Sequence, residues 1–354
     1  MKRKTIMTTS IAALVLAAIA YGWNTYNTFT RASLKTEDTD ALEKVAPVGP
    51  DFNADSAYAF CEAQCAFGPR AMNTSGHDQC RQWLVEKFRQ FGCTVTEQHA
   101  NLTGYDGTTL HATNIIAQYR PELAGRILLC AHWDSRPWAD NDPDEANWRK
   151  PIIAANDAAS GVGVMLEIAR LLAEIENGTQ HAQNTQAAPK VGIDFICFDA
   201  EDWGTPQWAE DQTNSADTWA LGAQYFAQNL PPRYLARYGI LLDMVGGQGA
   251  KFYEEMMSLN YAPAIVKKVW QAARQAGYGS FFPKKNGGYI TDDHLPLNEE
   301  AQIPTIDIIA YYPDCPQSSF GPTWHTLSDD MAHLDRQTLK AVGQTLVQVL
   351  WTEE

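Results

Sequence analysis

Short apolar segments alternate with amphipathic helical patterns along most of the chain, and this order constrains the fold more than any other feature. Runs rich in Val, Ile, Leu and Phe predict strands, and apolar residues spaced three and four apart predict helices. The predicted strands are residues 94–97, 112–119, 126–132, 191–198, 238–244 and 305–310. The predicted helices are residues 56–67, 78–92, 161–175, 221–229, 262–276 and 334–351. This alternation favours an α/β fold with a mostly parallel, twisted central sheet flanked by helices on both faces.

The N-terminal segment has the pattern of an export signal. Basic residues at positions 2–4 precede an apolar run over residues 11–20, which ends in a small-x-small sequence that a signal peptidase could cut. An uncleaved anchor is the alternative, although the run is shorter than the roughly 20 residues of a membrane span. We therefore expect an exported protein, periplasmic or secreted. The expected segments are a signal at 1–20, an extended leader at 21–50 and a single α/β domain at 51–354.

The charge balance argues against nucleic acid as a partner. The chain has 27 Lys and Arg against 42 Asp and Glu, a net charge of -15, and such a surface repels phosphate backbones. Its seven cysteines leave at least one thiol unpaired because the number is odd. The sequence contains no Cys-x-x-Cys, so a cysteine-ligated zinc site is not supported.

Acidic and histidine residues follow three of the predicted strands. They are His132 and Asp134 after the third strand, Asp199, Glu201 and Asp202 after the fourth, and Asp243 near the end of the fifth. In open α/β sheets, ligands bind in the crevice outside the carboxyl ends of the strands. The sequence therefore predicts that these side chains share one edge of the sheet.

Asp157, Asp202 and His325 together form a candidate zinc-binding set. Two carboxylate oxygens and one imidazole nitrogen leave the fourth position of a tetrahedral zinc open to substrate. The adjacent Glu201 is a candidate general base. Taken alone, Asp157 would be the N-cap of the helix that follows it, and His325 a surface or hydrogen-bonded residue. Their combination with Asp202 and Glu201 favours the metal.

Five motifs, in this order, resemble those of the zinc aminopeptidase superfamily. They are Ala131-His-Trp-Asp-Ser135, Asn156-Asp-Ala-Ala-Ser-Gly161, Phe198-Asp-Ala-Glu-Asp202, Leu241-Leu-Asp-Met244 and Trp324-His-Thr326. The resemblance runs from about residue 51 to the C-terminus and implies the α/β-hydrolase-like sandwich of the aminopeptidases. Within it, Asp292-Asp-His-Leu-Pro296 and the pair Trp324-His325 are similar to the glutaminyl-peptide cyclotransferases, also called glutaminyl cyclases.

The resemblance implies an activity and its cofactor. The activity is cyclisation of N-terminal glutamine in peptides and proteins to pyroglutamate, with release of ammonia. One zinc ion per chain is implied, held by Asp157, Asp202 and His325, and Glu201 matches the carboxylate that moves protons. Asp202 departs from the animal enzymes, which carry Glu there, so its loop must approach the metal more closely. A monomer is the expected state, with no lasting association with a membrane unless the signal stays uncleaved.

Further residues receive roles from the same resemblance. Asp243 and Asp293 match two acids in a hydrogen-bonded network beside the substrate, where one can share a proton with the other. The alternative for Asp293 is that it caps or orients its loop. The resemblance also implies that Trp324 forms one aromatic wall of the substrate pocket and that Trp208 or Trp203 forms the other. His294 is expected to be a hydrogen-bond partner that orients the site.

Two other functions stay open. A di-zinc aminopeptidase would use the counterparts of His132 and Asp243 for a second metal bridged by Asp157, and all three residue types are present. An exported module that has lost catalysis and only binds peptides is the other alternative. Metal content separates the three, since one zinc, two zincs and none are their respective signatures.

Overall fold

The computed structural model describes residues 47–178, 187–213 and 215–354. The predicted signal and residues 21–46 of the predicted leader lie outside this range. The last residues of that leader run along helix α9 (Arg336–Thr352), where Val48 N–H donates to Gln348 Oε1 at 2.9 Å and Gln344 Nε2 donates to Pro50 O at 3.0 Å. Within the described ranges, no helix has both the length and the apolar character needed to cross a membrane.

Six strands of the described chain form one mixed sheet. Their order across it is β1-β2-β4-β3-β5-β6. Their bounds are β1 Thr94–Thr103, β2 Thr109–Tyr119, β3 Arg126–His132, β4 Gly192–Phe198, β5 Tyr238–Asp243 and β6 Thr305–Ile309. Strands β4, β3, β5 and β6 are parallel, while β2 pairs antiparallel with both β1 and β4. The carboxyl ends of four parallel strands therefore share one edge.

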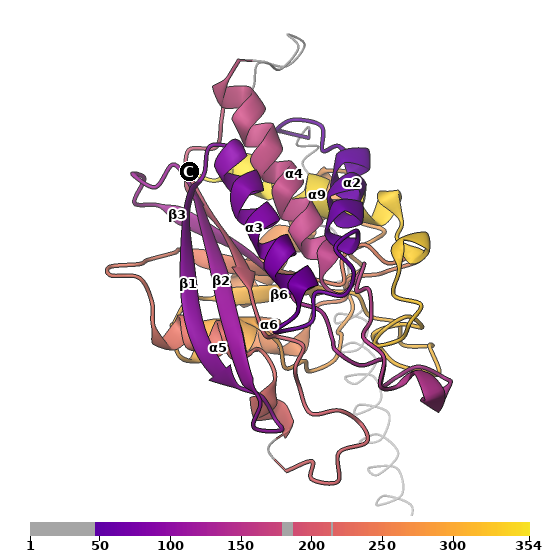
Figure 1. Cartoon of the computed structure of the whole chain (residues 1–354). Helices are drawn as coiled ribbons and strands as arrows, with labels where there is room; N and C mark the ends of the chain where they lie inside the picture. Colours follow the sequence, from indigo (N-terminus) through magenta and orange to yellow (C-terminus); the bar gives the residue numbers. More distant parts are fainter. Residues whose placement is uncertain (1–46, 179–186, 214) are drawn as a thin grey trace, which may run out of the picture. The chain divides into compact units, whose positions relative to one another are not determined.

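Helices cover both faces of this sheet. In Figure 1, α2, α3, α4 and α9 lie together on one face, and α5 lies on the other. The alternation of side chains along β4 explains this, because Ile193, Phe195 and Cys197 join the first core while Ile196 and Phe198 join the second. The helix bounds are α2 Ala54–Cys65, α3 Ser75–Gln90, α4 Ala159–Glu176, α5 Leu221–Gln228, α6 Met256–Tyr261, α7 Pro263–Gln275 and α8 His294–Glu299.

A glycine at the start of α4 brings that helix unusually close to the sheet. A Cβ at Gly161 would lie 2.2 Å from Leu242 O and 2.8 Å from the Cβ of Ala131. Any side chain would therefore push α4 away from β3 and β5. Because Gly161 permits the close approach, Asp157 just before α4 reaches the edge where β5 ends in Asp243.

The predicted α/β class is confirmed, and the predicted strands and helices are all present, with β3 at its predicted bounds and the others with shifted ends. Two features differ. The hairpin of β1 and β2 is longer than expected, because residues 98–103 and 109–111 are mostly polar, and their apolar members Ala100, Leu102 and Leu110 are too few to form a continuous apolar run. Helices α6 and α8 were not expected, since six residues are too few to show helical periodicity.

Candidate active site

Three parallel strands deliver the predicted acids and imidazole to one place. His132 ends β3, Asp243 ends β5, and Glu201 and Asp202 follow β4 after the two residues Asp199 and Ala200. Asp157 and the loop carrying His325 complete the group. The prediction that these side chains share the carboxyl edge of the sheet agrees with the structure, and all of them are at most 8% exposed.

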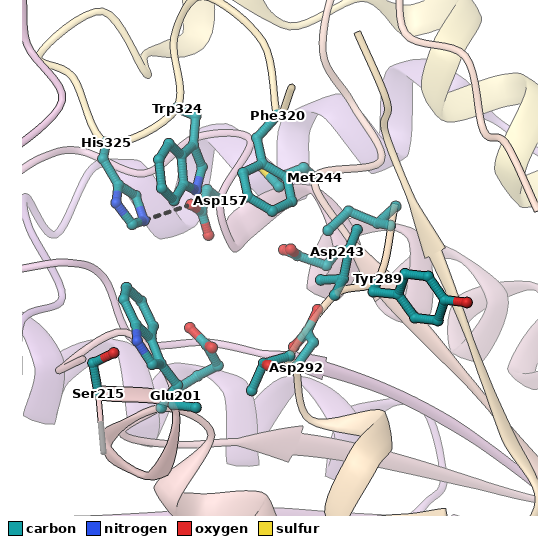
Figure 2. A pocket seen from close by; sticks show the side chains of 15 residues that line it. Asp157, Glu201, Ser215, Asp243, Met244, Tyr289, Asp292, Phe320, Trp324 and His325 are labelled. Carbon is teal, nitrogen blue, oxygen red and sulfur yellow. Dashed lines mark ion pairs between the residues drawn. The ribbon is translucent and has the colours of Figure 1, made fainter. Parts of the chain in front are cut away.

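Asp157, Asp202 and His325 form a compact group that we call the His325 triad. Each residue offers one ligand atom within 4.8 Å of those of the others. His325 Nε2 lies 3.3 Å from Asp202 Oδ1 and 3.6 Å from Asp157 Oδ2, an approach marked by the dashed line in Figure 2. Asp157 is not the N-cap of α4, because that position is Ala158 and no side chain caps the helix. The carboxylate of Asp157 is thus directed to the site instead.

The His325 triad fits a zinc ion by its donors and by one orphaned atom. Two carboxylates and an imidazole suit zinc and leave a position for substrate. Asp202 Oδ2 is buried and has no hydrogen-bond partner among the described residues, so it is free to ligate. His325 Nδ1 faces Asp140 Oδ1 at 3.5 Å, and a carboxylate there leaves Nε2 as the ligating nitrogen.

His132, Asp157 and Asp243 form a second group that shares Asp157, which we call the His132 triad. His132 Nε2 lies 2.9 Å from Asp157 Oδ1 and 3.5 Å from Asp243 Oδ1. Burial alone would lower the pKa of His132, but hydrogen bonds to Asp134, Asp157 and Asp243 raise it well above its ordinary value. This triad therefore favours a proton on the imidazole.

Glu201 stands beside both triads, and its environment favours the protonated form of its carboxyl group. Figure 2 shows it across the pocket from Trp324 and His325. Burial raises the pKa of Glu201 well above its ordinary value, more strongly than His132 lowers it. Asp134 fixes the backbone there, because Glu201 N–H and Asp202 N–H donate to its two oxygens at 3.1 and 3.2 Å. Glu201 is thus held where a group that both takes and returns a proton is useful.

Left-handed backbone conformations flank the site. Ala200, Met244 and His325 have φ values of 53°, 48° and 54°, respectively. Each such residue costs on the order of 1 kcal/mol and persists only where the surroundings impose it. The strain directs Glu201, Asp243 and the His325 ring into the same space.

A pocket of about 330 Å³ opens onto these residues. Its polar floor includes Asp157, Glu201 and Asp243, and its apolar wall includes Trp324 and Phe320 (Figure 2). His325 is sandwiched by indoles, since its ring centroid lies 3.7 Å from that of Trp324 and 5.8 Å from that of Trp219. The fifteen lining residues are Asp157, Glu201, Ser215, Ala216, Trp219, Asp243, Met244, Tyr289, Ile290, Thr291, Asp292, Ile309, Phe320, Trp324 and His325.

The second tryptophan of the wall is neither of the two that the sequence suggested. Trp203 and Trp208 do not line this pocket but pack against Trp138 with ring centroids 5.3 and 5.7 Å away. Trp219, just before α5, takes the wall position. The sequence carried a weak signal for it, namely an aromatic residue at the end of the Trp-rich loop that leads into α5.

The acids of the Asp292-Asp293-His294 motif also lie differently from the expectation. Asp292 lines the pocket, whereas Asp293 and His294 are fully buried behind it. Burial, and then Asp243, raises the pKa of Asp292 to about 7. His294 lies 3.4 Å from Glu255 Oε2 rather than in the pocket. Asp293 is the N-cap residue of α8, but its side chain makes no capping bond.

One positioning residue has no counterpart among the predictions. Asp329 is buried and accepts hydrogen bonds from Asn156 N–H at 2.7 Å and Asp157 N–H at 3.0 Å. It thereby ties the loop of His325 to the segment of Asp157. The sequence placed Asp329 four residues after His325 but gave no sign of its partner.

Fold and site together define an α/β enzyme with a buried carboxylate and imidazole centre suited to a metal ion. The sequence model of peptidase family M28 matches residues 114–350. The chain therefore belongs to peptidase family M28.

Solved and curated relatives carry the names of two activities. A glutaminyl cyclase from Bacteroides thetaiotaomicron, solved with N-acetylhistamine bound, is 51% identical with a TM-score of 0.81 over 87% of this chain and 100% of its own. A leucine aminopeptidase precursor from the same species is 50% identical with a TM-score of 0.80 over the same shares of 87% and 100%. The aminopeptidase YwaD of Bacillus subtilis is 26% identical over 273 residues, 74% of this chain. This chain spans 50% of the length of YwaD. Because the first two are almost equally similar, the site has to distinguish the activities.

Proposed function

We propose that this protein cyclises N-terminal glutamine of peptides and proteins to pyroglutamate, releasing ammonia, with one zinc ion in the His325 triad. The observation that carries the proposal is the pocket of about 330 Å³, in which Glu201 faces the triad beneath aromatic walls. Its size suits one side chain rather than an extended peptide. The named relative from Bacteroides thetaiotaomicron, a glutaminyl cyclase, supports this reading.

The reaction joins the α-amine nitrogen to the γ-carbonyl carbon of the same glutamine and breaks the bond from that carbon to the amide nitrogen. Asp157, Asp202 and His325 are the residues that would hold zinc. When bound, zinc supplies Lewis-acid polarisation of the γ-carbonyl oxygen. The protein must supply the proton transfers and the geometry.

Glu201 is the residue placed for both proton transfers. It takes a proton from the α-amine as the ring closes and delivers it to the departing amide nitrogen, which leaves as ammonia. A carboxyl group whose pKa is raised by burial is a better proton acceptor when ionised than an ordinary one. Asp243 and Asp292 line the same pocket and accept hydrogen bonds from the α-amine.

The aromatic walls exclude water from this reaction. Water attacking the same carbonyl would deamidate the glutamine instead of cyclising it. Trp219 and Trp324 line the pocket on the His325 side, and Phe320 and Ile309 close it further. An apolar wall leaves the α-amine as the only nucleophile near the carbonyl.

A di-metal aminopeptidase is the second candidate, and one observation favours it. The His132 triad shares Asp157 with the His325 triad, so the side chains for two adjacent metal ions are present and buried. The leucine aminopeptidase precursor and YwaD carry that activity in their names.

The deciding experiment compares two short peptides that differ only in having Gln or Leu at the N-terminus. The assay measures ammonia and product mass, each with and without a zinc chelator. We expect the Gln peptide to lose ammonia, the Leu peptide to stay intact and the chelator to stop the reaction. Release of free leucine would instead assign the aminopeptidase activity.

We further propose that the chain is exported and acts as a monomer. The basic residues 2–4 and the apolar run 11–20 are the support for export. N-terminal sequencing of the mature protein tests cleavage near residue 20, and sedimentation of the purified chain tests the monomer.

A further inference from the structure

Arg136 and Asp140 form a fully buried ion pair next to the His325 triad. Both residues are 1% exposed. Arg136 Nε donates to Asp140 Oδ1 at 2.6 Å, and Nη2 donates to Oδ2 at 2.8 Å, a two-point pairing that only a guanidinium can make. A buried charge pair of this kind costs desolvation free energy and is weak evidence for stability by itself. Its contacts with the site give it another use.

The third nitrogen of Arg136 holds the loop that carries Asp202. Nη1 donates to Asp202 O at 3.1 Å and also lies 3.3 Å from Asp202 Oδ1 and 3.4 Å from Gly204 O. Oδ1 therefore lies against a cation, and Oδ2 has no hydrogen-bond partner within the described ranges. Arg136 thus holds Asp202 Oδ1, the oxygen that also lies 3.3 Å from His325 Nε2, and so fixes the orientation of this carboxylate in the triad.

Asp140 orients the imidazole of His325, as Arg136 orients the carboxylate of Asp202. Its Oδ1 lies 3.5 Å from His325 Nδ1, and both of its oxygens accept hydrogen bonds from the Arg136 guanidinium. The next residue adds two backbone anchors, since Asn141 N–H donates to His325 O at 3.0 Å and Asn141 Nδ2 donates to Trp324 O at 3.2 Å. Residues 136–141 therefore hold the loop of His325 through contacts with its side chain and with its backbone.

The same guanidinium also supports the aromatic wall. The Arg136 Cζ atom lies 4.6 Å from the ring centre of Trp219 and 5.3 Å from that of Trp138. Trp219 in turn stacks on His325 at an interplanar angle of 10°. One side chain therefore contacts a proposed ligand, the partner of another ligand and a wall of the pocket.

We propose that Arg136 and Asp140 are a positioning pair that sets Asp202, His325 and Trp219 in one arrangement, so that zinc affinity and the shape of the pocket depend on the same contact. The inference rests on the zinc site of the proposed function. It concerns how the chain holds that site and applies whichever peptide the enzyme processes.

The test measures zinc dissociation constants by chelator competition for Arg136→Lys and Asp140→Asn. We expect both constants to rise by about 10- to 100-fold, the range seen for groups that orient metal ligands. Arg149→Lys is the matched control, because Arg149 also lies over an indole of the same cluster, 4.2 Å from the centre of Trp208, but is exposed and not at the site. Its zinc constant should stay within about twofold of that of the unchanged chain.

A second readout separates positioning from a general loss of structure. At saturating zinc, Arg136→Lys should recover most of its kcat for the Gln peptide but keep a KM raised by about tenfold, because Trp219 has lost its support. Asp140→Asn is nearly isosteric and carries the zinc test if Arg136→Lys fails to fold. Zinc constants within twofold of the unchanged chain for folded Asp140→Asn overturn the proposal. A chain that binds zinc but does not cyclise refutes the proposed function and leaves this inference standing.

Discussion

The two triads use similar residues and share Asp157, yet their internal contacts differ. In the His132 triad, His132 Nε2 is already within 2.9 Å of Asp157 Oδ1, so the nitrogen that would bind a metal is engaged by a carboxylate. In the His325 triad, the nearest approaches of His325 Nε2 are 3.3 and 3.6 Å. Each triad also has one buried carboxylate oxygen without a hydrogen-bond partner in the described chain, Asp243 Oδ1 in the first and Asp202 Oδ2 in the second, so the imidazole nitrogen is where the two differ. Ligand types alone therefore do not define a metal site. What matters is whether the ligand atoms are free.

The largest expected effect comes from removing the imidazole of each triad in turn. His325→Ala should lose its zinc and lower kcat/KM for the Gln peptide by about 10⁴-fold, the loss expected when several kcal/mol of metal stabilisation disappear. His132→Ala should retain one zinc per chain and lose far less activity. Metal analysis and steady-state kinetics on both variants measure this.

A different metal content would remove the distinction between the two triads. Two zinc ions per unchanged chain, with one remaining in each variant, would make the triads equivalent and would support the di-metal aminopeptidase.

A smaller effect is expected at the acid between the triads. Glu201→Gln should lower kcat by about 10³-fold, within the usual contribution of a general acid and base, and leave zinc content unchanged. Glu210→Gln, in the same loop but exposed, is the control and should have no effect. If Glu201→Gln instead releases the zinc, Glu201 is a ligand and its assigned role is wrong.

The next largest effect is expected from the aromatic walls of the pocket. It tests whether Trp219, as in the structure, or Trp208, as the sequence suggested, forms the second wall. Trp219→Ala should raise KM for the Gln peptide by about tenfold, because a wall in contact with the side chain is lost. Trp208→Ala should leave KM within about twofold, since Trp208 packs on Trp138 away from the pocket. If the two substitutions raise KM equally, Trp208 also contributes to the wall of the pocket.

The sequence predicted what local patterns encode. Apolar runs located the strands, and apolar residues spaced three and four apart located the helices. The positions of His132, Glu201, Asp202 and Asp243 at or after strand ends predicted that they meet at one edge of the sheet. The pairing of β4 between β2 and β3 was not predictable, since it depends on contacts between distant segments.

The missed residues belong to loops without a repeating pattern. Trp219, Asp292 and Arg136 reach the site through turns whose path no periodicity records. Asp293 was assigned to the substrate network by its resemblance to an acid of the glutaminyl cyclases, and the sequence does not show which of the two adjacent acids lines the pocket. Only the turn into α8 decides which of them faces the pocket.

The last prediction concerns stability rather than activity, at the pocket acid Asp292, whose pKa is raised in part by Asp243 of the His132 triad. The folded pKa of Asp292 is about 7, raised by burial and then by Asp243, against an ordinary value of 3.8. Between these two pH values the folded state binds a proton that the unfolded state has lost, so this contribution to stability is complete below pH 4 and is lost as pH rises to 7. Asp292→Asn removes that proton. The metal-free variant should therefore lose less stability across this window, with a slope smaller by up to about 1.4 kcal/mol per pH unit. Urea unfolding in chelator at pH 4 to 8 measures both proteins. If the free energy of unfolding of the two proteins changes with pH in parallel, the pKa of Asp292 is not raised in the folded chain, and this prediction is wrong.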